Sequence, residues 1–118
     1  MDLSRAYFIL QGKGGINMTV TVVARWKTPD IAAAAATTRR AKAFWKKHGV
    51  QDVRLSQIFT GPHTGQFLVT MVYADMPTYA KVQAAGNADP EFQKIIAQIR
   101  DDGALIQERE ILIGIDLT

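Results

Sequence analysis

The sequence contains no cysteine and only two histidines among its 118 residues. Without a thiol, the chain has no disulfide framework, no thiolate metal site and no cysteine nucleophile. Two histidines are too few for a three-histidine zinc site within one chain. The composition therefore predicts neither a metal ion nor a cofactor.

The motifs of nucleotide-binding proteins and of hydrolases are missing too. The run Gly12–Gly15 includes Lys13, but it lacks the spacing and the strand–loop–helix context of a phosphate loop. No Gly-x-Ser-x-Gly turn is present, which excludes the nucleophile arrangement of α/β-hydrolases.

Long hydrophobic runs are also absent. The run Ala6–Leu10 is shorter than the apolar core of a secretory signal, about 7–15 residues, or a membrane helix, about 18. The formal net charge is only +3, and we expect the basic residues from Arg39 to Lys47 to lie on a solvated helix face. We therefore predict a cytoplasmic protein that binds neither membrane nor nucleic acid.

The length of 118 residues and the hydrophobic fraction of 47% fit one domain with a single core. The patterned part of the chain is residues 17–118, which we predict to be that domain. Residues 1–16 precede it as an arm or an extra edge strand. Met18 is an alternative start of the protein.

Hydrophobic patterning predicts the element order β-α-β-β-α-β. The expected strands, rich in β-branched and aromatic residues, are Met18–Trp26, Val53–Phe59, Phe67–Tyr73 and Leu105–Ile113. The first helix is expected over Ile31–His48; the second begins at Met76 and restarts at Pro90. The expected N-caps are Thr28, Asp75 and Asp89. This order predicts an α+β, ferredoxin-like fold, in which both helices cover one face of a four-stranded antiparallel sheet.

The two halves look like copies of one unit if Pro29 is matched to Pro77. That alignment gathers five apolar residues on the sheet face that points away from the helices: Val23, Phe67, Val69, Met71 and Tyr73. So much apolar surface is not normally left in water. A second copy packed face to face would cover it, so we predict a twofold homodimer.

This pattern resembles the dimeric α+β barrel superfamily. The residues that carry the resemblance are the strand Met18–Trp26 leading into Thr28-Pro29, the loop Gly61–Gly65, and the segment Ala88–Phe92. The superfamily includes antibiotic-biosynthesis monooxygenases, polyketide cyclases, NIPSNAP-like proteins, stress-responsive barrel proteins and haem-using relatives. The resemblance covers residues 17–114 and implies a dimeric α/β barrel.

Three residues are candidates for catalysis. His63 lies in the hairpin loop, where it could act as a base, or it is simply an exposed turn residue. Tyr73 and Arg25 are expected at matched places near the strand ends, where they could stabilise an oxyanion. Alternatively, Arg25 and Tyr73 form pairs within the dimer interface, with Glu108 or Glu110 as partners.

Five residues could line a ligand pocket between the helices and the sheet: Trp26, Phe44, Trp45, His48 and Tyr79. Aromatic residues at such places are also common in cores. His48 is a second candidate base, or a residue that stabilises the end of the helix.

The resemblance implies cofactor-independent oxygenation, or an aldol-type cyclisation, of a small aromatic or polyketide-like substrate. The alternative is a non-catalytic dimeric module that binds a small apolar ligand or a protein. Haem binding is a third possibility, and it would require a histidine that faces a large cavity. A pocket that contains His63, His48 or Tyr73 would favour the enzyme, whereas a space filled by aromatic side chains would favour the module.

Overall fold

The computed structural model of the protein describes residues 18–117. The arm or edge strand predicted over residues 1–16 lies outside the described residues. The elements, in chain order, are β1 (Val20–Lys27), α2 (Ile31–Lys47), β2 (Asp52–Gln57), β3 (Phe67–Tyr73), α3 (Met76–Ala88), α4 (Pro90–Asp101) and β4 (Leu105–Ile113). All seven predicted segments are present, and the ferredoxin-like α+β fold is confirmed.

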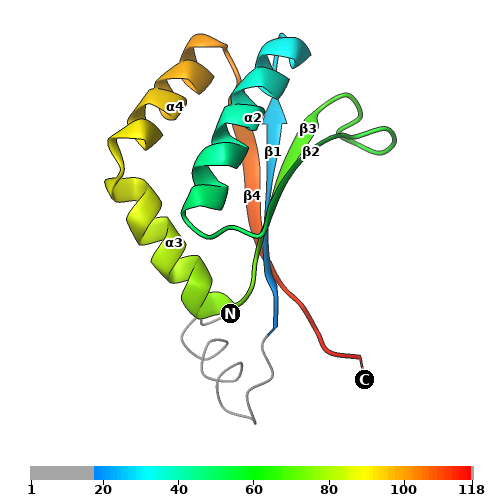
Figure 1. Cartoon of the computed structure of the whole chain (residues 1–118). Helices are drawn as coiled ribbons and strands as arrows, with labels where there is room; N and C mark the ends of the chain where they lie inside the picture. The colour runs from blue at the N-terminus through cyan, green and yellow to red at the C-terminus, as the bar shows by residue number, and fades with distance from the viewer. Residues whose placement is uncertain (1–17, 118) are drawn as a thin grey trace.

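The four strands form one sheet in the order β2-β3-β1-β4, and every neighbouring pair is antiparallel. The three helices lie together on one face of this sheet (Figure 1). The other face carries no helix of the described chain. Between residues 18 and 117, no helix is both long enough and apolar enough to cross a membrane.

Aspartates begin all three helices. The side chain of Asp75 accepts a hydrogen bond from Thr78 N at 2.8 Å, and that of Asp89 accepts one from Glu91 N at 3.0 Å. Both caps were predicted. The prediction for α2 was wrong: the cap is Asp30, not Thr28. The Asp30 carboxylate is better placed, because it accepts directly from the backbone N–H of Ala33.

Gly49, predicted to end the first helix, adopts a positive φ of 114° just after the helix ends at Lys47. Such a backbone conformation favours glycine. After Gly49 the chain changes direction, buries the side chain of Val50 and continues into β2.

The core lies between the helices and the sheet. Its buried apolar residues are Val20, Val22, Phe44, Trp45, Val50, Val53, Tyr73, Val82 and Ile95. Phe67 is buried as well, and Val69 and Met71 pack against the core from β3.

The predicted placement of the apolar residues of β3 is therefore wrong. In the β1–β3 register, Met71 lies opposite Val22 and Tyr73 lies opposite Val20, so both point toward the helices. The prolines used for the alignment are not equivalent: Pro29 precedes the cap of α2, whereas Pro77 follows the cap of α3. A shift of one residue moves every side chain to the opposite face.

The face away from the helices is consequently mixed in character. Its apolar residues are Val23, Leu68, Val72 and Leu112, all at least partly exposed. Thr21 and Thr70 lie among them, with Arg25, Arg54, Glu108 and Glu110 around them. This face is less apolar than the sequence analysis predicted.

Candidate functional site

A cavity of about 400 Å³ lies between the helices and the sheet. This volume is within the range of small-molecule sites. Its floor is formed by side chains of all four strands: Val22, Ala24, Trp26, Val53, Leu55, Phe67, Val69, Met71, Ile106 and Arg109. Its roof comes mainly from α2 and α4: Ala34, Thr37, Thr38, Ala41, Trp45, Phe92, Ile95, Ile96, Ile99 and Asp102.

Most of this lining is apolar, so the cavity suits a ligand that is itself largely apolar. Trp26 and Trp45, two of the predicted pocket residues, both line it. The indole Nε1 of Trp26 is buried and has no hydrogen-bond partner in the described chain. The predicted pocket between helices and sheet therefore exists.

Asp102, at the C-terminal end of α4, is the only carboxylate in the lining that the described chain provides. Its Oδ2 accepts a hydrogen bond from Thr37 Oγ1 at 2.8 Å, and its Oδ1 accepts one from Gln98 Nε2 at 2.8 Å. These bonds fix the carboxylate at the α2–α4 contact. A carboxylate held against an apolar cavity can act as a proton acceptor.

Arg109 of β4 is the only basic residue among the described lining residues. Arg109 lies opposite Ala24 in the β1–β4 register, on the helix side of the sheet, and it is exposed to solvent. Its Nη2 donates a hydrogen bond to the phenol oxygen of Tyr79 at 3.0 Å. Gln83 of α3 lines the same cavity, so one of its ends is polar.

Tyr73 lies beside this polar end but is wholly buried, and it does not line the cavity. Its hydroxyl oxygen accepts a hydrogen bond from Gln83 Nε2 at 2.9 Å, and its ring meets that of Tyr79 edge-on at 5.0 Å. Burial raises the pKa of Tyr73 to about 12. Tyr73 is therefore a protonated core residue that buttresses Tyr79 and Gln83.

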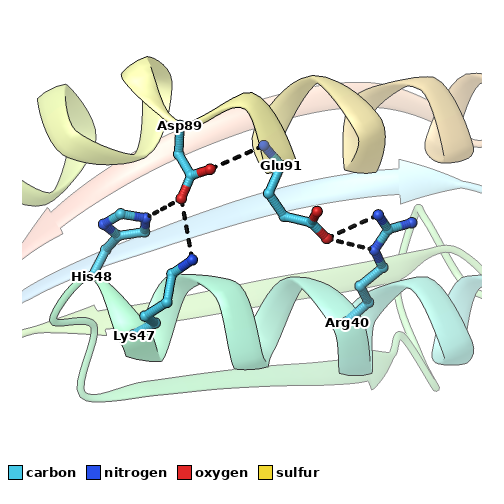
Figure 2. Close-up of polar contacts among 5 residues, drawn as sticks. All are labelled: Arg40, Lys47, His48, Asp89 and Glu91. Atoms are coloured by element: carbon cyan, nitrogen blue, oxygen red, sulfur yellow. Dashed lines mark hydrogen bonds and ion pairs between the residues drawn. The ribbon is translucent and has the colours of Figure 1, made fainter.

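His48 lies outside the cavity lining, in a polar cluster between helices (Figure 2). Its Nε2 lies 2.9 Å from Asp89 Oδ2, and Lys47 Nζ lies 3.2 Å from the same oxygen. Hydrogen bonds from Glu91 N, His48 and Lys47 lower the pKa of Asp89 to about 2. Because Asp89 joins α3 to α4, this cluster ties the helix junction to the end of α2.

A second pair lies along the same helix contact. Arg40 donates from Nε and Nη2 to Glu91 Oε1 at 3.0 and 2.8 Å (Figure 2). Phe44, a predicted pocket residue, is instead a core residue that contacts Trp45, His48 and Phe92 through its ring. The α2–α4 contact thus combines ion pairs at the surface with aromatic packing beneath.

His63 and Arg25 also lie outside the cavity lining. His63 is exposed in the loop between β2 and β3, as its alternative interpretation held. Arg25 pairs with Glu108, at 3.1 Å between Nη2 and Oε2, and points away from the helices. Since Tyr73 faces the helices near the other end of β1, the expected match of Arg25 with Tyr73 was wrong.

The structure therefore brings Trp26 and Trp45 to the cavity and sets Tyr79 beside it, but it places the other predicted residues elsewhere. Sequence reasoning missed Arg109 and Asp102. Arg109 could have been found, because it breaks the apolar alternation of β4 between Ile106 and Ile111. Asp102 gave no such signal, because an aspartate before a glycine reads simply as a helix end. No cluster of three potential metal ligands occurs in the described chain.

No protein-family model matches the sequence, and neither does any curated protein. Several solved structures share its fold. SnoaB of Streptomyces nogalater, a cofactor-independent oxygenase, is 18% identical with a TM-score of 0.61, over 84% of this chain and 95% of SnoaB. A NIPSNAP family protein of unknown function from Agrobacterium tumefaciens is 20% identical with a TM-score of 0.58, over 82% and 86% of the two chains.

A candidate antibiotic biosynthesis monooxygenase from Deinococcus radiodurans is 14% identical, with a TM-score of 0.55 over 82% of this chain and 91% of that one. The resemblance drawn from the sequence is thus confirmed at the level of the fold. At these low sequence identities, the similarity establishes a shared fold and leaves the activity to be inferred from the cavity.

Proposed function

We propose that the protein is a cofactor-independent oxygenase that acts on a small aromatic or polyketide-like molecule in the cavity. The observation that carries this proposal is the apolar cavity of about 400 Å³ between the helices and the sheet. SnoaB, which shares the fold, is a cofactor-independent oxygenase.

The chemistry requires an acidic C–H on the substrate and one molecule of O₂. Asp102 accepts the proton, and the negative charge that develops on the substrate is delocalised over its aromatic rings. The carbanion then reduces O₂ to a peroxide anion bound to the same carbon, and this anion takes the proton back from Asp102 to become a hydroperoxide. Loss of water from the hydroperoxide leaves a ketone. Overall, a CH₂ group and O₂ become a C=O group and water.

Anthrone tests this proposal, because its CH₂ group lies between two aromatic rings and its oxidation gives anthraquinone. We expect O₂ uptake and anthraquinone formation above the rate without protein. Asp102→Asn should lower the rate by about 10²–10⁴-fold. Asp101→Asn, at an exposed neighbouring position, is the control and should retain the rate. Full activity of the Asp102→Asn variant, or no activity of the wild type, would overturn the assignment.

The second candidate is a binding module without chemistry. It is favoured by the finding that neither His48 nor His63 lines the cavity. In this case anthraquinone and anthrone would bind, as measured by tryptophan fluorescence, and O₂ uptake would stay at the background rate. Fluorescence is suitable because the only two tryptophans of the chain line the cavity.

We also propose that the sheet face away from the helices binds a second copy of the chain. Val23, Leu68, Val72 and Leu112 give this face an apolar component, and opposite charges lie around it. These features suit a twofold interface, in which each patch meets its own copy. Val69 and Met71 do not contribute, because they line the cavity.

Light scattering tests the homodimer. The chain mass is 13.0 kDa, so the dimer should scatter as a particle of twice that mass. Val23→Asp should yield monomers, because the new charge would be buried without a partner. Ala36→Asp, on the exposed surface of α2, should remain dimeric. A wild-type particle of 13.0 kDa would refute the proposal.

A further inference from the structure

The polar end of the cavity has more hydrogen-bond donors than acceptors. Arg109 contributes five N–H groups, of which one donates to Tyr79. Gln83 uses one N–H on Tyr73 and retains the other. In the described chain, the amide oxygen of Gln83 is the only acceptor that these two side chains supply.

No carboxylate within residues 18–117 forms an ion pair with Arg109. Of the other arginines in this part of the chain, Arg25, Arg40 and Arg54 each pair with an acidic side chain, whereas the exposed Arg39 and Arg100 do not; neither of these two lines the cavity. The acidic neighbours of Arg109 along β4, Glu108 and Glu110, lie on the opposite face of the sheet. Within the described part of the chain, the cation therefore lies at the cavity without a carboxylate partner.

Tyr79 holds the guanidinium at this place. Its hydroxyl oxygen accepts from Arg109 Nη2 at 3.0 Å, and its ring is fixed edge-on against Tyr73, which is wholly buried. A planar guanidinium that is fixed on one side presents its remaining N–H groups as a fork. Two parallel N–H groups match the two oxygens of a carboxylate.

We propose that the ligand of this cavity is an aromatic carboxylic acid, whose ring system fills the apolar part and whose carboxylate binds Arg109. Gln83 donates to the same carboxylate, and Tyr79 acts as a positioning residue for Arg109. This inference rests on the proposed ligand site in the cavity and adds the charge of the ligand and its orientation. The rings extend away from Arg109 toward Ile95 and Ile99 of the roof.

A matched pair of probes tests the proposal: anthracene-2-carboxylate and the uncharged anthracene-2-carboxamide. Isothermal titration should show that the wild type binds the carboxylate about 10- to 100-fold more tightly, as a charge-assisted bidentate contact predicts. Arg109→Gln should abolish this preference and leave the affinity for the carboxamide within about twofold. Arg109→Lys should retain only part of the preference, because an ammonium lacks the fork.

Two controls separate a specific contact from general charge or packing effects. Arg39→Gln removes the same charge from the exposed face of α2 and should leave the preference unchanged. Tyr79→Phe should reduce the ratio of the two affinities, whereas a merely structural role would lower both affinities together.

The outcomes distinguish the two levels of the proposal. If the wild type binds both probes equally, or if Arg109→Gln keeps the preference, the assignment of Arg109 is overturned while the cavity remains a ligand site. If neither probe binds, the cavity itself is not an aromatic site, and this inference fails with the proposed function.

Discussion

Filling the cavity should stabilise the protein and block its ligand. Ala34 of α2 lines the cavity and is not among the residues packed against the buried core. Ala34→Leu keeps a good helix former at this position and adds three carbon atoms on the cavity side. The substitution therefore changes the cavity with little disturbance of the helix.

The magnitude follows from the volume available. Three buried carbon atoms contribute about 2.4 kcal/mol at about 0.8 kcal/mol for each methylene. The loss of leucine rotamer freedom costs about 0.5–1 kcal/mol. We therefore expect a net gain of about 1–2 kcal/mol in the free energy of unfolding, which raises the Tm by roughly 3–8 °C.

Urea unfolding followed by circular dichroism measures this gain, and titration with anthracene-2-carboxamide measures the binding. We expect the stability to rise and the affinity to fall by at least about tenfold, since the added side chain occupies ligand volume. Ala36→Leu, on the exposed side of the same helix, is the control and should change neither. A loss of stability in Ala34→Leu would show that the site has no free volume and would refute the cavity.

Three further predictions concern the helices that cover the cavity. Gly86→Ala should lower the free energy of unfolding by about 1–2 kcal/mol, because the new methyl group would overlap the buried ring of Trp45, with Cη2 only 2.6 Å away. The pKa of Asp89 is about 2 instead of 3.8. The ionised Asp89 carboxylate therefore stabilises the fold fully above about pH 4, and this stabilisation disappears as the pH falls through about 2. Over this interval the wild type should lose stability more steeply than Asp89→Asn. Asp30→Ala should cost about 1 kcal/mol as the loss of an N-cap, and Thr28→Ala clearly less.

Each of these predictions has an outcome that contradicts it. The first prediction is contradicted if urea unfolding shows that Gly86→Ala is as stable as the wild type or more stable, which is what the helix propensity of alanine alone would give. The second prediction is checked by acid titration of the wild type and of Asp89→Asn, followed by circular dichroism. Equal losses of stability in the two proteins as the pH falls from about 4 to about 2 would contradict it. An equal effect of Asp30→Ala and Thr28→Ala on the Tm would show that the two residues share the cap.

The fold could be predicted because its signals are local. Residue alternation identifies the strands, and an aspartate followed closely by a proline identifies the start of α3 and of α4. Apolar residues at helical spacing identify α4 as well. The relation between β1 and β3 is not local, and the alignment on prolines gave the wrong face. Alignment on the true caps, Asp30 and Asp75, shifts the halves by an odd number of residues and puts Met71 on the same face of the sheet as Val22, as the structure has it.

The site was harder to predict, because a cavity is defined by the side chains that fail to fill it. The sequence shows aromatic residues in α2 and α4, and these could equally fill the helix–sheet space or line it. In the structure, Phe44 and Trp45 both pack against Phe92, with ring centroids 6.1 and 5.5 Å apart, so these rings meet at the α2–α4 contact. The two helices are therefore held together by their own aromatic contact.

Small residues occupy the positions that could otherwise close the space beneath these helices. Ala34 and Ala41 line the roof from α2, and Ala24 lies opposite Arg109 in the floor. Aromatic packing between the helices and alanines toward the sheet together keep the interior open. Arg109 then acquires its proposed role from its position. Ala24 lies beside it, no carboxylate of residues 18–117 pairs with it, and its charge lies at the space that the small residues leave.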